Sequence, residues 1–270
     1  MTGNALQHNI LYSCYYKQKF GHEQLVEEHS LGILLSGELR LFSDEGTLII
    51  KPGNIGLAKR SQLVKSLKIP GPSGEACKAI NIIIPQELLR KYAAENNIEK
   101  QLPYKGKSFI DLSHDKFIKS FFDSLLPYFD EPNKLTDKFA ILKTYEAIEL
   151  LLQADSSLKN LLFDFQEPYK IDLEAFMNKN YNYNVPLKHF AKLTGRSPAT
   201  FKRDFKKLFE LTPEKWLQKK RLEKAHYLIA QKHRKPSDVY LEVGFENLSH
   251  FSTSFKKKYG YNASSLALQN

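Results

Sequence analysis

The sequence is poor in the residues that hold together disulfide-rich domains and metal centres. Only two cysteines, Cys14 and Cys77, occur in 270 residues, which is too few for a disulfide framework. The histidines near the start are dispersed, and residues 30–113 contain none. These early histidines are His8, His22 and His29. A barrel-type metal site needs a cluster of histidine and glutamate ligands, so we expect no metal and no cofactor.

Long apolar runs and targeting signals are lacking as well. No run approaches the roughly 20 apolar residues that span a bilayer. The N-terminal segment has no charged region followed by an apolar one, as a signal peptide would have. The sequence therefore predicts a cytoplasmic protein without membrane association.

Positive charge is concentrated in one part of the chain. The net charge is +10, yet residues 1–169 carry 20 Lys and Arg against 21 Asp and Glu. Residues 170–270 carry 20 against 9, a net charge of +11. A basic segment favours nucleic acid, because neutralising phosphates releases counterions. Charge alone is equally compatible with a solvated surface or with a site for an acidic partner.

Residues 9–85 have the pattern of short β-strands. Apolar runs occupy 10–16, 31–42, 47–50, 55–58 and 79–84. Asp44, Glu45 and Gly46 separate two of these runs and predict a hairpin turn. Short strands at this spacing predict a small barrel or sandwich.

Residues 86–165 are predicted to be helical. After a short helix at 86–96, apolar residues recur at spacings of three and four from Phe117 to Leu126 and from Leu135 to Leu152. These two helices would form an antiparallel pair around a break at 127–132. Their apolar faces either cover the β-structure or form a dimer seam.

Charge and pattern both change near residues 166–170, and all later segments have the pattern of helices. The sequence thus predicts an α+β protein with two domains, at 1–165 and 170–270. The first would contain β-structure at 9–85 and helices at 86–165. The second would be all helical.

The basic domain contains one pattern twice, at 187–207 and 239–257. Each copy has a short apolar-faced helix, a turn at glycine (Gly195 or Gly244), a capping residue and a helix with phenylalanines four residues apart. A helix-turn-helix has this order, since its first helix braces the second in the DNA major groove. Between the copies, Thr212 and Pro213 open a helix of about twenty residues, roughly 30 Å long. That length is close to the roughly 34 Å between successive major-groove faces, so one chain would contact two adjacent groove segments.

The first copy has the residues of a base-reading helix. Ser197 is the predicted cap and Pro198 the first helical residue. The predicted buried stripe consists of Phe201, Phe205, Leu208 and Phe209. The opposite face carries Ala199, Lys202, Arg203, Lys206 and Lys207. Lys202 and Arg203 are placed to reach base edges, whereas the two later lysines are expected at phosphates.

The second copy has a different chemistry. Asn247 is the predicted cap, and the uncharged reading positions are Leu248, Ser249, Ser252 and Thr253. His250, Lys256 and Lys257 are expected phosphate contacts, with Lys258 next to them as a contact or a solubilising charge. We therefore expect the first copy to discriminate bases and the second mainly to anchor.

The basic domain resembles the AraC/XylS family of bacterial transcription regulators. The resemblance is carried by FKRDFKK at 201–207, TPEKWL at 212–217, RLEKA at 221–225, VGF at 243–245 and HFSTSFKKKYG at 250–260. It implies base-facing roles for Ala199, Lys202, Arg203, Leu248, Ser249, Ser252 and Thr253. It also implies a homodimeric activator whose partners are double-stranded DNA and RNA polymerase.

The N-terminal half resembles the cupin-type regulatory domains of that family, through LSGELRL at 35–41 and IKPGNIGL at 50–57. The resemblance implies a cupin-like β-barrel that senses a small effector or a protein partner, and the sequence leaves these two open. A cupin-type enzyme fused to a DNA-binding domain is the alternative function. The missing ligand cluster argues against it, and we expect no enzyme activity.

Overall fold

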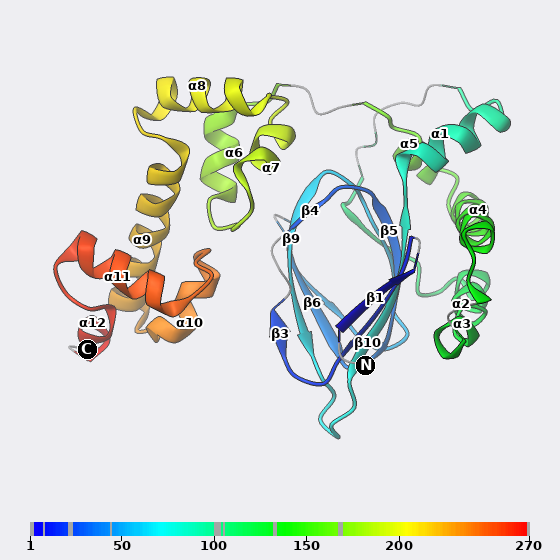
Figure 1. Cartoon of the computed structure of the whole chain (residues 1–270), viewed down its shortest axis with the longest axis horizontal. Coiled ribbons are helices and arrows are strands. Elements are labelled where there is room, and N and C mark those ends of the chain that lie inside the picture. The colour runs from blue at the N-terminus through cyan, green and yellow to red at the C-terminus, as the bar shows by residue number, and fades with distance from the viewer. Residues whose placement is uncertain are drawn as a thin grey trace. The chain divides into compact units, whose positions relative to one another are not determined.

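Strands occupy the first part of the chain and helices the last (Figure 1). The computed structural model describes residues 3–7, 9–20, 24–43, 45–99, 104, 106–131, 134–166 and 170–268. The chain divides into two compact units, Met1–Gln166 and Glu167–Asn270. All described strands belong to the first unit, and the described elements of the second unit are helices. An N-terminal sheet-rich domain and a C-terminal helical domain together confirm the predicted α+β class.

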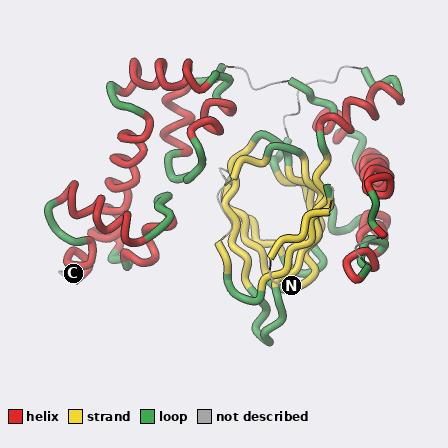
Figure 2. Tube along the Cα trace, viewed as in Figure 1, coloured by secondary structure: helices red, strands yellow, loops and turns green. Residues whose placement is uncertain are grey.

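The described strands of the first unit form two antiparallel sheets (Figure 2). The six-stranded sheet has the order β1 (Gly3–Gln7), β2 (Ile10–Tyr15), β10 (Cys77–Ile84), β5 (His29–Ser36), β8 (Ile55–Ala58) and β11 (Phe109–Asp111). The five-stranded sheet has the order β3 (Lys19–Phe20), β9 (Gln62–Ile69), β6 (Glu38–Ser43) and β7 (Gly46–Ile50), with β4 (Gln24–Val26) also paired to β9. Among the residues described, no ladder joins the two sheets into one closed ring, so the predicted barrel is not confirmed.

The apolar run at 31–42 is two strands rather than one. The chain turns at Gly37, whose φ of +78° suits glycine. A Cβ at this position would lie 2.6 Å from the carbonyl oxygen of Ile69, so a side chain would not fit. The turn sends β5 into one sheet and β6 into the other. The predicted hairpin that follows is confirmed, because β6 and β7 pair from Leu39 opposite Ile50 to Ser43 opposite Gly46.

Helices pack on one face of the six-stranded sheet (Figure 1). They are α1 (Gln86–Glu95), α2 (Lys116–Asp123), α3 (Pro127–Asp130), α4 (Asp137–Ala154) and α5 (Leu158–Leu162). The shared core includes Ile80 and Ile82 of β10 with Phe121, Phe122 and Ile148 of the helices. Helix α3 lies within the predicted break, which also contains residues outside the described ranges.

Part of the predicted apolar stripe on α2 and α4 faces outward. Phe117 is 62% exposed, Phe139 47% and Leu142 51%. The opposite faces of the same helices cover the sheet, with Ile118 and Ile148 fully buried. Both uses of these helices that the sequence left open are therefore compatible with the fold: one face covers β-structure, and the other leaves apolar side chains accessible.

A buried histidine and a buried arginine connect the sheet to the last residues of the first unit. His29 is 1% exposed and accepts a hydrogen bond at Nδ1 from the backbone N–H of Arg60, at 3.3 Å. Arg60 is itself 6% exposed, and its Nη2 donates to the carbonyl oxygens of Asp164 and Gln166 at 2.8 and 3.0 Å. Burial, and then the positive charges of Arg60 and Lys59, lower the pKa of His29 to about 3. His29 is thus a neutral structural side chain.

The second unit consists of seven described helices. They are α6 (Leu173–Asn180), α7 (Leu187–Leu193), α8 (Pro198–Phe209), α9 (Pro213–Lys232), α10 (Pro236–Glu242), α11 (Leu248–Tyr259) and α12 (Ala263–Leu268). The predicted long helix is α9, which Thr212 caps by accepting from the N–H of Lys215. Within the described parts of the chain, no helix combines the length and apolar character needed to cross a membrane.

Candidate nucleic-acid interface and a cavity in the first unit

The turn between α7 and α8 forms as its sequence predicts. Gly195 has a φ of +63°, the left-handed conformation that glycine adopts without strain. Ser197 Oγ accepts from the N–H of Thr200 at 3.2 Å, and Pro198 occupies the first helical position. These two features set the direction in which α8 leaves the turn.

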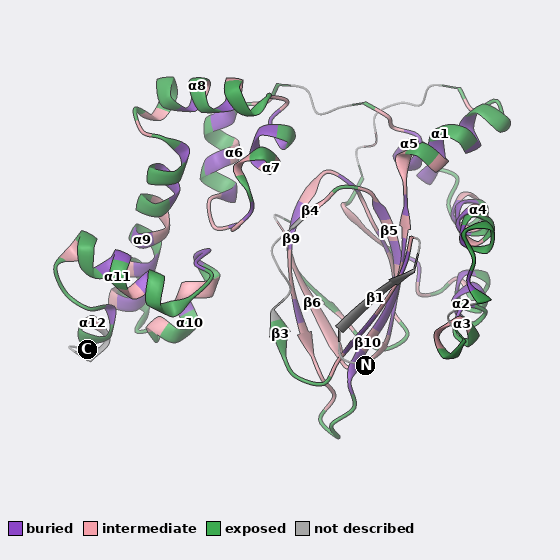
Figure 3. Ribbon diagram, in the orientation of Figure 1, coloured by how far each residue is buried: buried purple, intermediate pink, exposed green. Residues whose placement is uncertain are grey.

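Most residues of α8 are exposed (Figure 3). Its buried face is aromatic and its exposed face is largely basic. Phe201 and Phe205 are fully buried, and Phe205 packs edge-on against Trp216 of α9. The prediction for Leu208 is wrong, because this side chain is 46% exposed, while Phe209 is half-buried against Trp216. Phe209, the next residue, takes the place against Trp216, and Leu208 faces outward from the same turn. The exposed face consists of Ala199, Lys202, Arg203, Lys206 and Lys207.

The carboxylate of Asp204 on α8 binds two basic residues that precede this helix. Asp204 Oδ2 lies 3.2 Å from Nε of Arg196 and 3.3 Å from Nζ of Lys170. Partial desolvation acts to raise the pKa of Asp204, but hydrogen bonds from Lys170 and Arg196 outweigh it and hold the pKa below its usual value. Arg203 lies 3.5 Å from the other oxygen and stays 76% exposed, so its guanidinium remains accessible. The sequence did not predict this network, although the adjacent Arg203 and Asp204 are a local signal for it.

The second copy of the pattern has the same backbone plan. Gly244 has a φ of +95°, and Asn247 Oδ1 accepts from the N–H of His250 at 2.7 Å, as a cap should. Phe251 and Phe255 are fully buried. Leu248, Ser249, His250, Thr253, Lys256 and Lys257 are exposed, whereas Ser252 is half-buried.

The exposed faces of α8 and α11 differ in charge. The α8 face presents four cationic side chains, and the first turns of α11 present none apart from His250. Lys258, at the other end of α11, is held by Glu223 of α9 at 3.1 Å and by the carbonyl of Lys219. That contact makes Lys258 a brace between helices rather than a free phosphate ligand.

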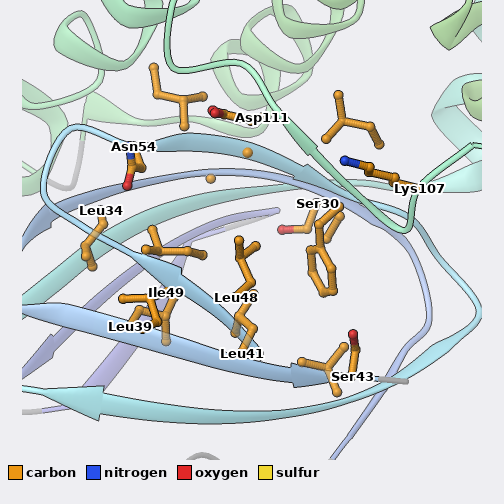
Figure 4. A pocket seen from close by; sticks show the side chains of 18 of the residues that line it. Ser30, Leu34, Leu39, Leu41, Ser43, Leu48, Ile49, Asn54, Lys107 and Asp111 are labelled. Carbon is orange, nitrogen blue, oxygen red and sulfur yellow. The ribbon is translucent and has the colours of Figure 1, made fainter. Parts of the chain in front are cut away.

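A large cavity lies between the two sheets of the first unit (Figure 4). Its volume is about 1100 Å³, ample for a small ligand. Aliphatic side chains such as Leu34, Leu39, Leu41 and Leu48 form most of the wall. The polar lining residues are Ser30, Ser43, Glu45, Thr47, Asn54, Asn81, Tyr104, Lys107 and Asp111. Such a lining fits a mainly apolar molecule with one or a few polar groups.

Little in this cavity resembles a metal centre. Among the residues described, no group of three His, Cys, Asp or Glu side chains is placed to hold a metal ion. His8 and His22 lie outside the described residues. Hydrogen bonds from the side chain and then the N–H of Ser113 lower the pKa of Asp111, so this carboxylate is ionised and engaged in its own turn.

Two family models match the chain. A helix-turn-helix domain matches residues 190–268, and the ExsA N-terminal regulatory domain matches residues 29–163. The first match includes α8 to α11. The second includes β5 to β11, which supply most of the cavity lining, and helices α1 to α5.

Two curated relatives match most of the chain, and a third matches one part of it. The HTH-type transcriptional regulator ExsA of Pseudomonas aeruginosa is 23% identical over 258 residues, which cover 92% of this chain and 89% of ExsA. The thermoregulatory protein LcrF of Yersinia pestis is 26% identical over 261 residues, covering 87% and 88%. The virulence regulon transcriptional activator VirF of Yersinia enterocolitica is 31% identical over 88 residues, covering 33% and 32%. Among solved structures, an apo variant of ToxT from Vibrio cholerae aligns over 99% of both chains, with 10% identity and a TM-score of 0.45.

Proposed function

The chain belongs to the AraC/XylS family of bacterial transcription regulators, and from that membership we propose that α8 and α11 enter two successive major-groove segments of one DNA duplex. As a family member it is a DNA-binding transcription regulator and not an enzyme. Its relatives include named transcriptional activators, and activation is the direction of regulation proposed for this chain.

The observation that carries the DNA proposal is the division of α8 into two faces. Phe201 and Phe205 are buried completely, so the opposite face is held outward by the core. Arg203 on that face is assigned a base contact, because a guanidinium donates two parallel hydrogen bonds to guanine O6 and N7. Lys202 and Ala199 are assigned neighbouring base contacts, and Lys206 and Lys207 phosphate contacts.

The α11 face is proposed to anchor more than to discriminate. Leu248, Ser249, Ser252 and Thr253 are assigned to base edges, but none of them makes the bidentate contacts that give strong discrimination. His250, Lys256 and Lys257 are assigned to phosphates. The unequal charge of the two faces supports this division of labour.

The first unit is proposed to be a cupin-like regulatory and dimerisation domain. The cavity between its sheets would hold a small effector, and the exposed apolar side chains of α2 and α4 would form a homodimer seam. Control by a partner protein is the alternative, in which the same seam or another surface of the first unit is occupied. In either case, RNA polymerase is the proposed partner in transcription. The proposed compartment is the cytoplasm.

Site selection tests the DNA proposal. Full-length protein would be incubated with a library of duplexes that contain a long random segment, and retained DNA would be sequenced after several rounds. We expect one consensus with two conserved segments about one helical turn apart. Enrichment of no sequence, or of one short segment alone, would contradict the proposal.

A further inference from the structure

Arg221, near the middle of α9, is bonded to the loop that precedes the first copy of the pattern. Its Nε donates to the carbonyl oxygen of Tyr181 and its Nη2 to that of Tyr183, both at 2.8 Å. Its Nη1 lies 3.5 Å from Oδ1 of Asn184. These acceptors belong to the segment between α6 and α7, so the central helix holds the segment that leads into the first copy, in addition to packing on α8 through Trp216.

Asn184 extends this connection to the second copy. Its Nδ2 donates to Oε1 of Glu246 at 2.9 Å. Glu246 lies in the turn between α10 and α11, one residue before the cap of α11. The two ends of one amide therefore join the central helix to the turn that orients α11.

The backbones also meet at this place. A Cβ at Gly244 would come within 2.6 Å of the carbonyl oxygen of Asn182 and 2.9 Å of Nε of Arg221. The turn of the second copy thus packs directly on the loop before the first, with Arg221 beside both. Burial and then the nearby Glu242 of α10 raise the pKa of Tyr181, as expected for a side chain close to the second copy.

The contact through Arg221, Asn184 and Glu246 restricts how the two helical pairs can rotate about α9. A lone helix between two small helical pairs would let each pair tilt about its own attachment to the helix. Here the pairs are also joined beside the helix, through Arg221, Asn184 and Glu246. Two attachments at separate points resist rotation in a way that one cannot.

We propose that Arg221 is a positioning residue that fixes the separation and relative rotation of α8 and α11. DNA would then be selected by the spacing between its two segments as well as by base identity. One inserted base pair moves a segment by about 3.4 Å and turns it by about 34°, which a rigid pair of helices cannot follow. The DNA consequence rests on the proposed function, whereas the rigidity itself does not.

Rigidity can be measured without DNA. Spin labels at Lys207→Cys and Lys257→Cys, both exposed, would report the distance between α8 and α11 in the full chain by double electron–electron resonance. Cys14→Ala and Cys77→Ala would remove the native thiols. We expect one narrow distance distribution with Arg221 intact, and a distribution about twice as wide with Arg221→Met.

Arg234→Met is the matched control for this measurement. Arg234 follows the central helix and forms an ion pair with Glu242 of α10. Glu242 belongs to the second copy, and Arg234 to the segment that leads into it. Its loss removes one exposed charge and no connection to the first copy. The width of the distance distribution should therefore stay unchanged in Arg234→Met.

A second variant guards against a folding defect in Arg221→Met. Asn184→Ala combined with Glu246→Ala removes the hydrogen bond between these two side chains. Asn184 is half-buried and Glu246 is exposed. Arg221 keeps its hydrogen bonds to the carbonyl oxygens of Tyr181 and Tyr183. Trp216 fluorescence would verify that each variant is folded. Equal widths in the parent, Arg221→Met and the double variant would overturn the proposal.

The DNA consequence is tested on the selected duplex with zero, one or two base pairs inserted between its segments. The readout is the ratio of dissociation constants for inserted and uninserted DNA. We expect a ratio of about 30 for the parent and about 3 for Arg221→Met, even if Arg221→Met binds more weakly overall. A purely structural defect would weaken binding to both duplexes alike. The same ratio in the parent and in Arg221→Met would overturn spacing selection. If no duplex is selected, the proposed function fails, and the distance widths still decide whether Arg221 positions the helices.

Discussion

Nε of Arg196 lies 3.2 Å from Oδ2 of Asp204, which ties the turn before α8 to the body of that helix. Arg196 is nearly buried, with a 7% exposed side chain, and its Nη1 also donates to the carbonyl oxygens of Ile171 and Thr194. One guanidinium therefore joins the start of the second unit, the turn and α8. The direction of α8 depends on this junction as well as on the cap at Ser197.

Replacement of Arg196 by methionine should destabilise the second unit. The change keeps the apolar stem but removes the charge-assisted hydrogen bonds to Asp204 and to two carbonyl oxygens, which lose their donor. We expect a loss of about 2 kcal/mol in the free energy of unfolding. Urea unfolding followed by the fluorescence of Trp216, the only tryptophan, measures it. Arg203→Met is the control, because Arg203 is 76% exposed; equal losses in the two variants would refute the junction.

Replacement of Arg203 by alanine should relax the base preference at one position of the DNA site. Loss of a bidentate guanine contact costs about 1–3 kcal/mol, or roughly 5- to 150-fold in affinity for the preferred base. Binding titrations against duplexes carrying each base at each position would reveal the relaxed position. Thr253→Ala should change affinity less than about twofold. Similar losses in both variants would mean that the two copies read DNA equally.

Replacement of Phe139 by glutamate should weaken self-association of the full chain. Phe139 is 47% exposed, Leu142 on the same helix is 51% exposed, and a carboxylate buried in an apolar seam would lack a partner. We expect the dimer dissociation constant to rise about tenfold or more in sedimentation velocity experiments. Lys138→Glu, the adjacent exposed position, should have a much smaller effect. Unchanged sedimentation of Phe139→Glu would remove this face from the dimer model.

Acid should destabilise the first unit through His29. Its pKa in the folded chain is about 3, below the usual value of 6.5, so the unfolded chain binds the proton first as pH falls. The stabilisation is present above the usual pKa of 6.5 and is lost progressively as pH falls toward 3. Over two pH units centred on that usual value, the loss should be about 1.4 kcal/mol.

Urea unfolding followed by circular dichroism measures this loss, and the Trp216 transition identifies the second unit. His29→Asn keeps an acceptor for the Arg60 N–H but cannot titrate. It should show about 1.4 kcal/mol less pH dependence than the parent chain. The same pH dependence in both chains would contradict a buried neutral histidine at this position.

Local signals in the sequence predicted the helical unit well. Gly195, Ser197 and Asn247 mark turns and caps through their own backbone preferences, which act over a few neighbouring residues. Leu208 was mispredicted because its burial depends on where α9 passes, and the helical period alone does not contain that information. Arg221 and Asn184 were missed for the same reason: their partners come from separate segments of the chain.

The β-structure was harder to predict. The turn at Gly37 was hidden inside one apolar run, since a change of sheet leaves the hydrophobic pattern unbroken. Strand β9 was missed because Lys65 and Lys68 interrupt its apolar residues. Lys68 lies over the ring of Tyr15, with its Nζ 4.3 Å from the ring centroid, a contact that only the folded sheet reveals. Pairing of distant strands, and hence the cavity between the sheets, depends on such contacts.

Methylation interference can show whether one chain enters two major-groove segments of the same duplex. Guanine N7 methylation blocks contacts in the major groove. On the selected duplex, we predict two clusters of interfering guanines about 10–11 base pairs apart on one face of the DNA. The stronger cluster should disappear in Arg203→Ala, which assigns it to α8. A single cluster confined to one groove segment would contradict the account.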